Sequence, residues 1–244
     1  MPTSKKQFAT IQHSADWHGH TFSIETGKLA GQADGAVVVH FDDNVFLVTA
    51  VMKKNPDENK DFLPLTVDFR ESYSAAGKIG GGKMRKREGR PSDQAILNSR
   101  LTDRALRPMF PKGMINDTVV TITPLALDHT QDLGVISIIG SSLAVMAGGI
   151  PFDGPVGAAR VGYHDELGYI LNPTYEQLQS SRLDMVVAGT ESAVLMVESE
   201  ADCLTEEVML GAVTFGHQQM QAAIKVINQP VIKSRFAELS AEVI

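Results

Sequence analysis

The chain has 244 residues, 43% of them apolar and 21% charged, and a formal net charge of −7, which is typical of a globular protein of one large domain or two small ones. Its single cysteine, Cys203, excludes an internal disulfide and favours a reducing compartment. No signal-peptide region opens the sequence and no apolar run approaches about 18 residues, so we expect a cytoplasmic protein without membrane association.

Four short apolar runs rich in β-branched residues open the chain, and turn signals separate them. They predict strands at residues 21–25, 36–40, 45–51 and 63–69. Asp42, Asp43 and Asn44 form a turn signal that predicts a hairpin between the second and third runs. We therefore expect this opening part to be antiparallel β structure.

Basic residues gather between residues 77 and 111. This stretch contains nine of the chain's 22 lysine and arginine residues and three acids, so its net charge is +6 while the rest of the chain carries −13. Crowded positive charges repel one another unless an anion offsets the repulsion. A polyanion is therefore the first expected partner.

The first part of this basic stretch differs physically from the second. Residues 77–91 contain five glycines and no hydrophobic period, which predicts a mobile loop that presents charge without fixed geometry. Ser92 is a predicted N-cap, and a helix is expected from there until just before Pro108.

Three arginines share one face of this predicted helix. Arg100, Arg104 and Arg107 stand at i, i+4 and i+7, which places them within roughly 60° of one another. One interpretation is a solvated helix face on which Asp103 and Glu88 are the ionic partners. The basic loop directly upstream favours the other interpretation, a surface for a phosphate chain.

The rest of the chain alternates between short strands and apolar helices. Strands are predicted at residues 118–123, 156–163, 169–171, 183–188 and 194–197. Helices are predicted at 134–149, which is small and apolar nearly all round, and at 205–227. This order predicts layers of mixed strands and helices without a doubly wound repeat, the α+β class.

Other chemical motifs are weak. The segment from Gly77 to Lys83 matches part of a nucleotide-binding P-loop, but Met84 stands where the magnesium-binding hydroxyl belongs, and Gly89 and Pro91 would break the helix that must follow. The seven histidines lack the spacing of metal ligands, and the cysteine has no basic neighbour in sequence. Local chemistry therefore predicts a binder of RNA or DNA phosphates.

Five stretches carry a more specific signal: REGRPSD, RLTDRALRPMFP, GGIPFDGPVGAARVGY, LDMVVAGTESAVLMVESEA and LGAVTFGH. Here the chain resembles bacterial polynucleotide phosphorylases, specifically the first of that family's two ribonuclease PH-like cores. The resemblance implies the fold of that core, which is ribosomal protein S5 domain 2-like. It also implies a homotrimeric ring that degrades RNA from 3′ to 5′, with inorganic phosphate as the attacking group.

The same resemblance implies that this core lacks the catalytic set. The active second core carries an Asp-x-Lys pair before Val-Ala-Gly, whereas here Asp184 is followed by Val186 at the lysine position. Leu178 stands at the position of the other catalytic aspartate, and residues 131–134, Gln-Asp-Leu-Gly, replace the serine-rich phosphate loop. We therefore expect no catalytic residue and no metal ligand in this chain, and the magnesium ion in the second core of the parent enzyme.

The predicted role of this core is to bind single-stranded RNA 3′ ends, guide them and support trimer assembly. The predicted RNA-binding residues are Lys83, Arg85, Lys86, Arg87, Arg90, Arg100, Arg104 and Arg107. The family commonly has two phenylalanines before the paired basic residues of the pore loop, and this chain has Lys83 and Met84 there instead, so charge must replace base stacking. Degradosome-type proteins are further implied partners.

Two alternatives stay open from the sequence. One is a complete single-core enzyme of the ribonuclease PH type, against which the valine at position 186 argues. The other is a non-catalytic RNA-binding subunit of an exosome-like ring. We expect residues 1–227 to form the core and residues 228–244 to begin a helical linker that is truncated.

Overall fold

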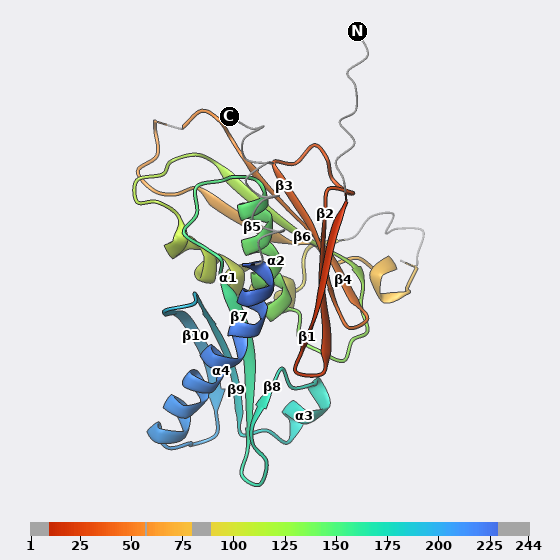
Figure 1. The fold of residues 1–244 in the computed structure, drawn as a ribbon, viewed down its shortest axis with the longest axis vertical. Helices are drawn as coiled ribbons and strands as arrows, with labels where there is room; N and C mark the ends of the chain where they lie inside the picture. The colour runs from red at the N-terminus through yellow and green to blue at the C-terminus, as the bar shows by residue number, and fades with distance from the viewer. Residues whose placement is uncertain (1–9, 57, 80–88, 229–244) are drawn as a thin grey trace.

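Two sheets and four α-helices form the protein in the computed structural model, which describes residues 10–56, 58–79 and 89–228 (Figure 1). The larger sheet has the strand order β1-β2-β3-β4-β6-β5 and the smaller one β10-β9-β7-β8. The strands are β1 (Ile11–Trp17), β2 (His20–Thr26), β3 (Gly35–Phe41), β4 (Asn44–Met52), β5 (Leu65–Phe69), β6 (Thr118–Ala126), β7 (Gly157–His164), β8 (Gly168–Leu171), β9 (Leu183–Gly189) and β10 (Val194–Ala201). The helices are α1 (Asp93–Leu106), α2 (Gly134–Ala147), α3 (Tyr175–Gln179) and α4 (Glu206–Ile227), with short 3-10 turns η1 (Ser74–Ala76) and η2 (Arg107–Met109). This arrangement confirms the predicted α+β class.

The larger sheet begins with a meander of consecutive antiparallel strands. β1 pairs with β2, β2 with β3, and β3 with β4, and the predicted hairpin at Asp42 and Asp43 joins β3 to β4. In β4 the alternating residues Phe46, Val48 and Ala50 are fully buried, as the period of two requires. One expectation was wrong: β5 is not part of the antiparallel opening, because it pairs in parallel with β6.

Helix α2 lies between the two sheets and is buried nearly all round, as its sequence predicted (Figure 1). It packs on β3 and β4 of the larger sheet and on β7 of the smaller one. Its C-terminal end approaches Gly35 so closely that a Cβ atom there would lie 1.9 Å from the carbonyl oxygen of Ala144. Only glycine fits at that contact.

Helix α4 covers one face of the smaller sheet, where it packs on β7 and β9 (Figure 1). It begins after its N-cap Thr205, whose hydroxyl accepts a hydrogen bond from the Val208 amide. No helix among the described residues is long and apolar enough to cross a membrane. The expected linker beyond residue 228 lies outside the described residues.

The first strand and the last helix meet through one side chain, Trp17. Its indole is 2% exposed and packs edge-on against Phe22 and Phe41, and its Nε1–H donates a hydrogen bond to the Gln219 carbonyl oxygen at 3.1 Å. The sequence pattern predicted neither β1 nor the short helix α3. Trp17 thus connects β1, which the sequence did not predict, to α4, the last helix.

Candidate functional site

Helix α1 holds the fixed half of the basic stretch, and its start is built as the sequence predicted. Ser92 is the N-cap, and its hydroxyl oxygen accepts a hydrogen bond from the Ala95 amide at 3.1 Å. Both the amide and the hydroxyl of Ser92 donate to the Glu71 carboxylate, at 3.0 and 2.7 Å. A second layer of hydrogen bonds thus anchors the helix start to the segment after β5.

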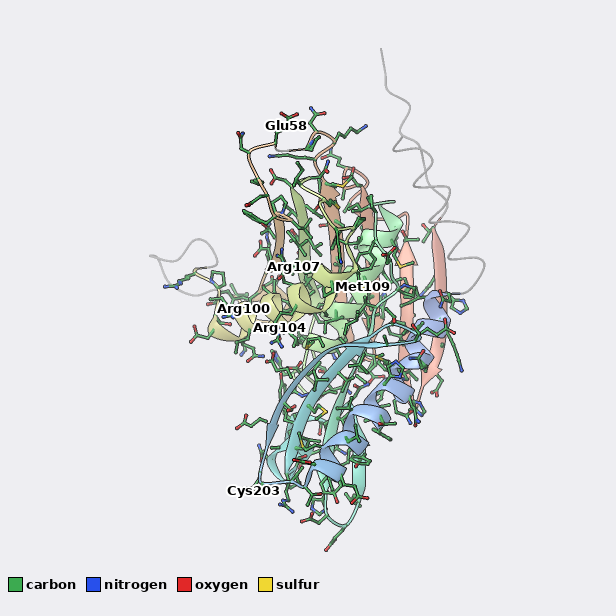
Figure 2. All side chains as sticks on the ribbon, turned by 90° about the vertical axis from the view of Figure 1, so that its left-hand side faces the viewer. Glu58, Arg100, Arg104, Arg107, Met109 and Cys203 are labelled. Carbon is green, nitrogen blue, oxygen red and sulfur yellow. The ribbon has the colours of Figure 1, made fainter. Side chains whose placement is uncertain are left out.

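The three arginines of α1 and of the turn η2 that follows it have different surroundings (Figure 2). Arg107 donates to both carboxylate oxygens of Asp103, at 2.9 and 2.6 Å, and to the carbonyl oxygens of Leu63 and Leu65. It therefore clamps the entry of β5, and its pairing with Asp103 is the one named in the less favoured interpretation, that of a solvated helix face.

Arg104 and Arg100 are both exposed. Arg104 pairs with Glu198 of β10, so it connects α1 to the smaller sheet, although both side chains are half exposed. Arg100 is exposed and has no ion-pair partner within the described part of the chain. Of the three, Arg100 has the guanidinium most available to an external anion.

The remaining predicted RNA-binding residues precede α1. Arg90 is exposed just before the N-cap. Lys83, Arg85, Lys86 and Arg87 lie outside the described residues.

An ionic triad occupies the position at which the resemblance had located the missing catalytic set. Arg160 of β7 donates from Nε to Asp184 Oδ1 of β9 at 2.6 Å, and its Nη2 donates to the other oxygen of the same carboxylate. Its Nη1 lies 2.7 Å from Oδ2 of Asp132. One guanidinium therefore neutralises two carboxylates that come from separate parts of the chain.

The triad is largely buried and well supported. The side chains of Asp132 and Arg160 are 9% and 13% exposed, and that of Asp184 is 36% exposed. Burial alone would lower the pKa of Arg160, but the hydrogen bonds and charges of the two aspartates reverse this effect and raise it above its ordinary value. The second oxygen of Asp132 accepts from the Gly134 amide at 2.7 Å, at the start of α2.

A cavity of ≈ 300 Å³ opens beside the triad. Its wall contains one guanidinium, that of Arg160, and four carboxylates: Asp132, Asp184, Glu198 and Glu200. The resulting negative charge disfavours a phosphate ion. The residues also do not fit a divalent cation, because both oxygens of Asp184 already accept from the arginine and Val186 supplies no ligand.

The resemblance implies an incomplete catalytic set at four positions. The structure brings together three of them, Asp132, Asp184 and Val186, but not Leu178. Leu178 lies on α3 and does not line the cavity. Among the described residues there is no group of three or more His, Cys, Asp or Glu placed to hold a metal ion. Sequence reasoning missed Arg160, and its only local signal was a lone charge inside the small and apolar stretch GAARVGY.

Comparison with protein families divides the chain at the junction between the two sheets. Residues 18–151, which run from β2 through α2, match the RNase PH domain described as 3′ exoribonuclease family, domain 1. Residues 154–219, which run from β7 into α4, match domain 2 of the same family. The two matches follow one another in the order in which the family numbers its domains.

Proposed function

The chain belongs to the 3′ exoribonuclease family as a ribonuclease PH-like core of the phosphorolytic type, and from this premise we propose that it is the non-catalytic first core of a polynucleotide phosphorylase. In this proposal the core binds the 3′ end of single-stranded RNA and guides it. Magnesium and inorganic phosphate act in a second core, and three chains form the ring.

The Arg160 triad is the observation that carries the proposal. Phosphorolysis needs a site that accepts the phosphate ion and stabilises negative charge on the transferred group. Here the only cation of the cavity wall is already bound to Asp132 and Asp184, and Val186 provides no proton or ligand. The charged groups that the reaction would need are therefore already paired with one another in an internal salt bridge.

The isolated chain is expected not to degrade RNA. Incubated with a labelled oligonucleotide, magnesium and inorganic phosphate, it should release no nucleoside diphosphate, while a complete polynucleotide phosphorylase added as a control should shorten the same oligonucleotide. Steady phosphorolysis by the pure chain would contradict the proposal and favour a complete single-core enzyme of the ribonuclease PH type.

Arg100 and Arg107 provide a matched pair for the RNA-guiding role. Arg100→Ala should reduce the slope of log affinity against log salt by about 0.7 for single-stranded RNA, since one phosphate contact is lost. Arg107→Ala should instead lower the free energy of unfolding, because the bonds to Asp103 and Leu65 are lost. The expected loss is only about 1 kcal/mol, since water partly screens these bonds. Fluorescence anisotropy at several salt concentrations and urea unfolding measure the two effects.

The opposite pattern would change the assignment. If Arg100→Ala left the salt slope unchanged while Arg107→Ala reduced it, the exposed arginine would not contact RNA and the clamp at β5 would.

A further inference from the structure

A cavity of ≈ 660 Å³ lies beside the N-terminal half of α1. This volume is in the range of small-molecule sites. Gln94 and Asn98 line both this cavity and the acidic cavity beside Arg160, so the two adjoin along the helix. We call the larger one the α1 cavity.

The interior of the α1 cavity is mainly apolar. Phe69 and Ala95, which are 3% and 1% exposed, line it together with the side chains of Pro124 and Leu133. Tyr73, whose side chain is 46% exposed, is a further lining residue. An aromatic ring next to an apolar wall suits a flat, weakly polar group such as a nucleobase.

The charges around the α1 cavity favour an anion. Lys78 and Arg90 are both exposed lining residues, and neither has an ion-pair partner among residues 10–56, 58–79 and 89–228. The two acids of the wall are committed elsewhere: Asp68 pairs with Arg70 at 2.8 Å, and Glu71 accepts the hydrogen bonds of the α1 N-cap. Two cations thus remain to meet a phosphate group.

We propose that the α1 cavity binds one nucleotide unit of single-stranded RNA, with the base against Tyr73 and the apolar wall and its phosphate between Lys78 and Arg90. This inference rests on the proposed function and adds a base-binding site to it. A free mononucleotide has the same chemistry as one unit of the RNA chain. The chain unit is proposed because the proposed function makes single-stranded RNA the ligand, and the test below measures the free mononucleotide separately.

The test compares two oligomers of equal length, an oligouridylate and an abasic ribose-phosphate chain that has the same charges but no bases. The wild-type protein should bind the oligouridylate about 10-fold more tightly, which corresponds to one stacked base. Uridine monophosphate, measured alone, should bind at least about 100-fold more weakly than the oligouridylate, because it meets only part of the basic surface.

Two sets of variants separate the base from the phosphate. Tyr73→Ala, at the exposed ring, and Ala76→Trp, which fills the cavity from η1, should each reduce the preference for bases to less than about twofold. Lys78→Ala combined with Arg90→Ala should weaken both oligomers equally. Arg182→Ala is the control, because it removes an exposed arginine of the smaller sheet, which pairs there with Asp165.

Each outcome identifies which idea fails. Equal binding of both oligomers by the wild-type protein would overturn the base-binding cavity while leaving RNA binding intact. Failure to bind either oligomer would overturn the proposed function itself. Uridine monophosphate binding as tightly as the oligouridylate would overturn the RNA-chain assignment and identify a free nucleotide as the occupant. Tyr73→Ala and Ala76→Trp proteins that fold and keep the full preference for bases would place the base outside this cavity.

Discussion

Arg160→Met should lower the free energy of unfolding by about 3 kcal/mol, the lower end of the range for breaking a buried ion pair. Methionine keeps much of the volume but removes the guanidinium that neutralises Asp132 and Asp184. Asp132 would then remain buried and charged without its partner, while the partly exposed Asp184 would regain some hydration. Urea unfolding followed by circular dichroism measures the loss.

Two variants control this experiment. Arg182→Met removes an arginine with an exposed partner, Asp165, and should cost less than about 1 kcal/mol. Adding Asp132→Asn to Arg160→Met should recover part of the loss, because the amide removes the buried charge and keeps an oxygen for the Gly134 amide. Equal stability of Arg160→Met and the wild-type protein would show that the triad contributes nothing to folding.

The contribution of the Arg160 charge to the free energy of unfolding should not change as the pH rises above neutral. Its pKa is raised in the folded protein, so its stabilisation is fully present below the ordinary pKa of the unfolded chain and would be lost only as the pH rose through the raised pKa. The difference in unfolding free energy between the wild-type protein and Arg160→Met should therefore stay constant from about pH 7 to about pH 10. The measurement is the same urea titration at several pH values.

Trp17→Ala should cost about 3–5 kcal/mol, the range for truncating a large buried aromatic side chain. The loss includes packing against Phe22 and Phe41 and the hydrogen bond to Gln219. Trp17→Phe is the matched variant: it retains a ring but not the donor, so about 1 kcal/mol should be lost through the unpaired carbonyl and the smaller ring.

The Trp17 comparison also tests whether β1 and α4 unfold together. Hydrogen exchange should show that both segments lose protection in Trp17→Ala, since this side chain joins them. Loss of protection in β1 alone would mean that the smaller sheet holds α4 without help from the first strand.

The sequence predicted the elements whose apolar residues repeat with a clear period. The strand around Val48 follows this rule, while the helix around Leu143 was predicted from a run that is apolar nearly all round, and both lie where the pattern indicated. β1 was missed because polar residues occupy much of it, and from Gln12 to its last residue only Trp17 is a large, fully buried side chain. The parallel pairing of β5 could not be predicted, because local periodicity carries no information about a strand's neighbour.

The candidate site was located in part. Val186 at the lysine position, beside the retained Asp184, predicted a degenerate centre, and the structure places both residues beside one cavity. The ion pairs of Arg160 in this centre were not predicted, because Arg160 meets Asp132 and Asp184 only after three separate segments have packed together. For the same reason, the sequence could not show that Arg107 is engaged with backbone carbonyls while Arg100 stays exposed.

The parallel pairing of β5 with β6 has a consequence for synthesis on the ribosome. The strands of the β1–β4 meander pair with their neighbours in sequence, so they can form as they emerge. Among the described strands β5 pairs only with β6, and the chain from Arg70 to Asp117, which includes α1, separates the two. Until β6 has left the exit tunnel, β5 has no strand beside it, and α1, which packs on β5, has no sheet edge to pack against.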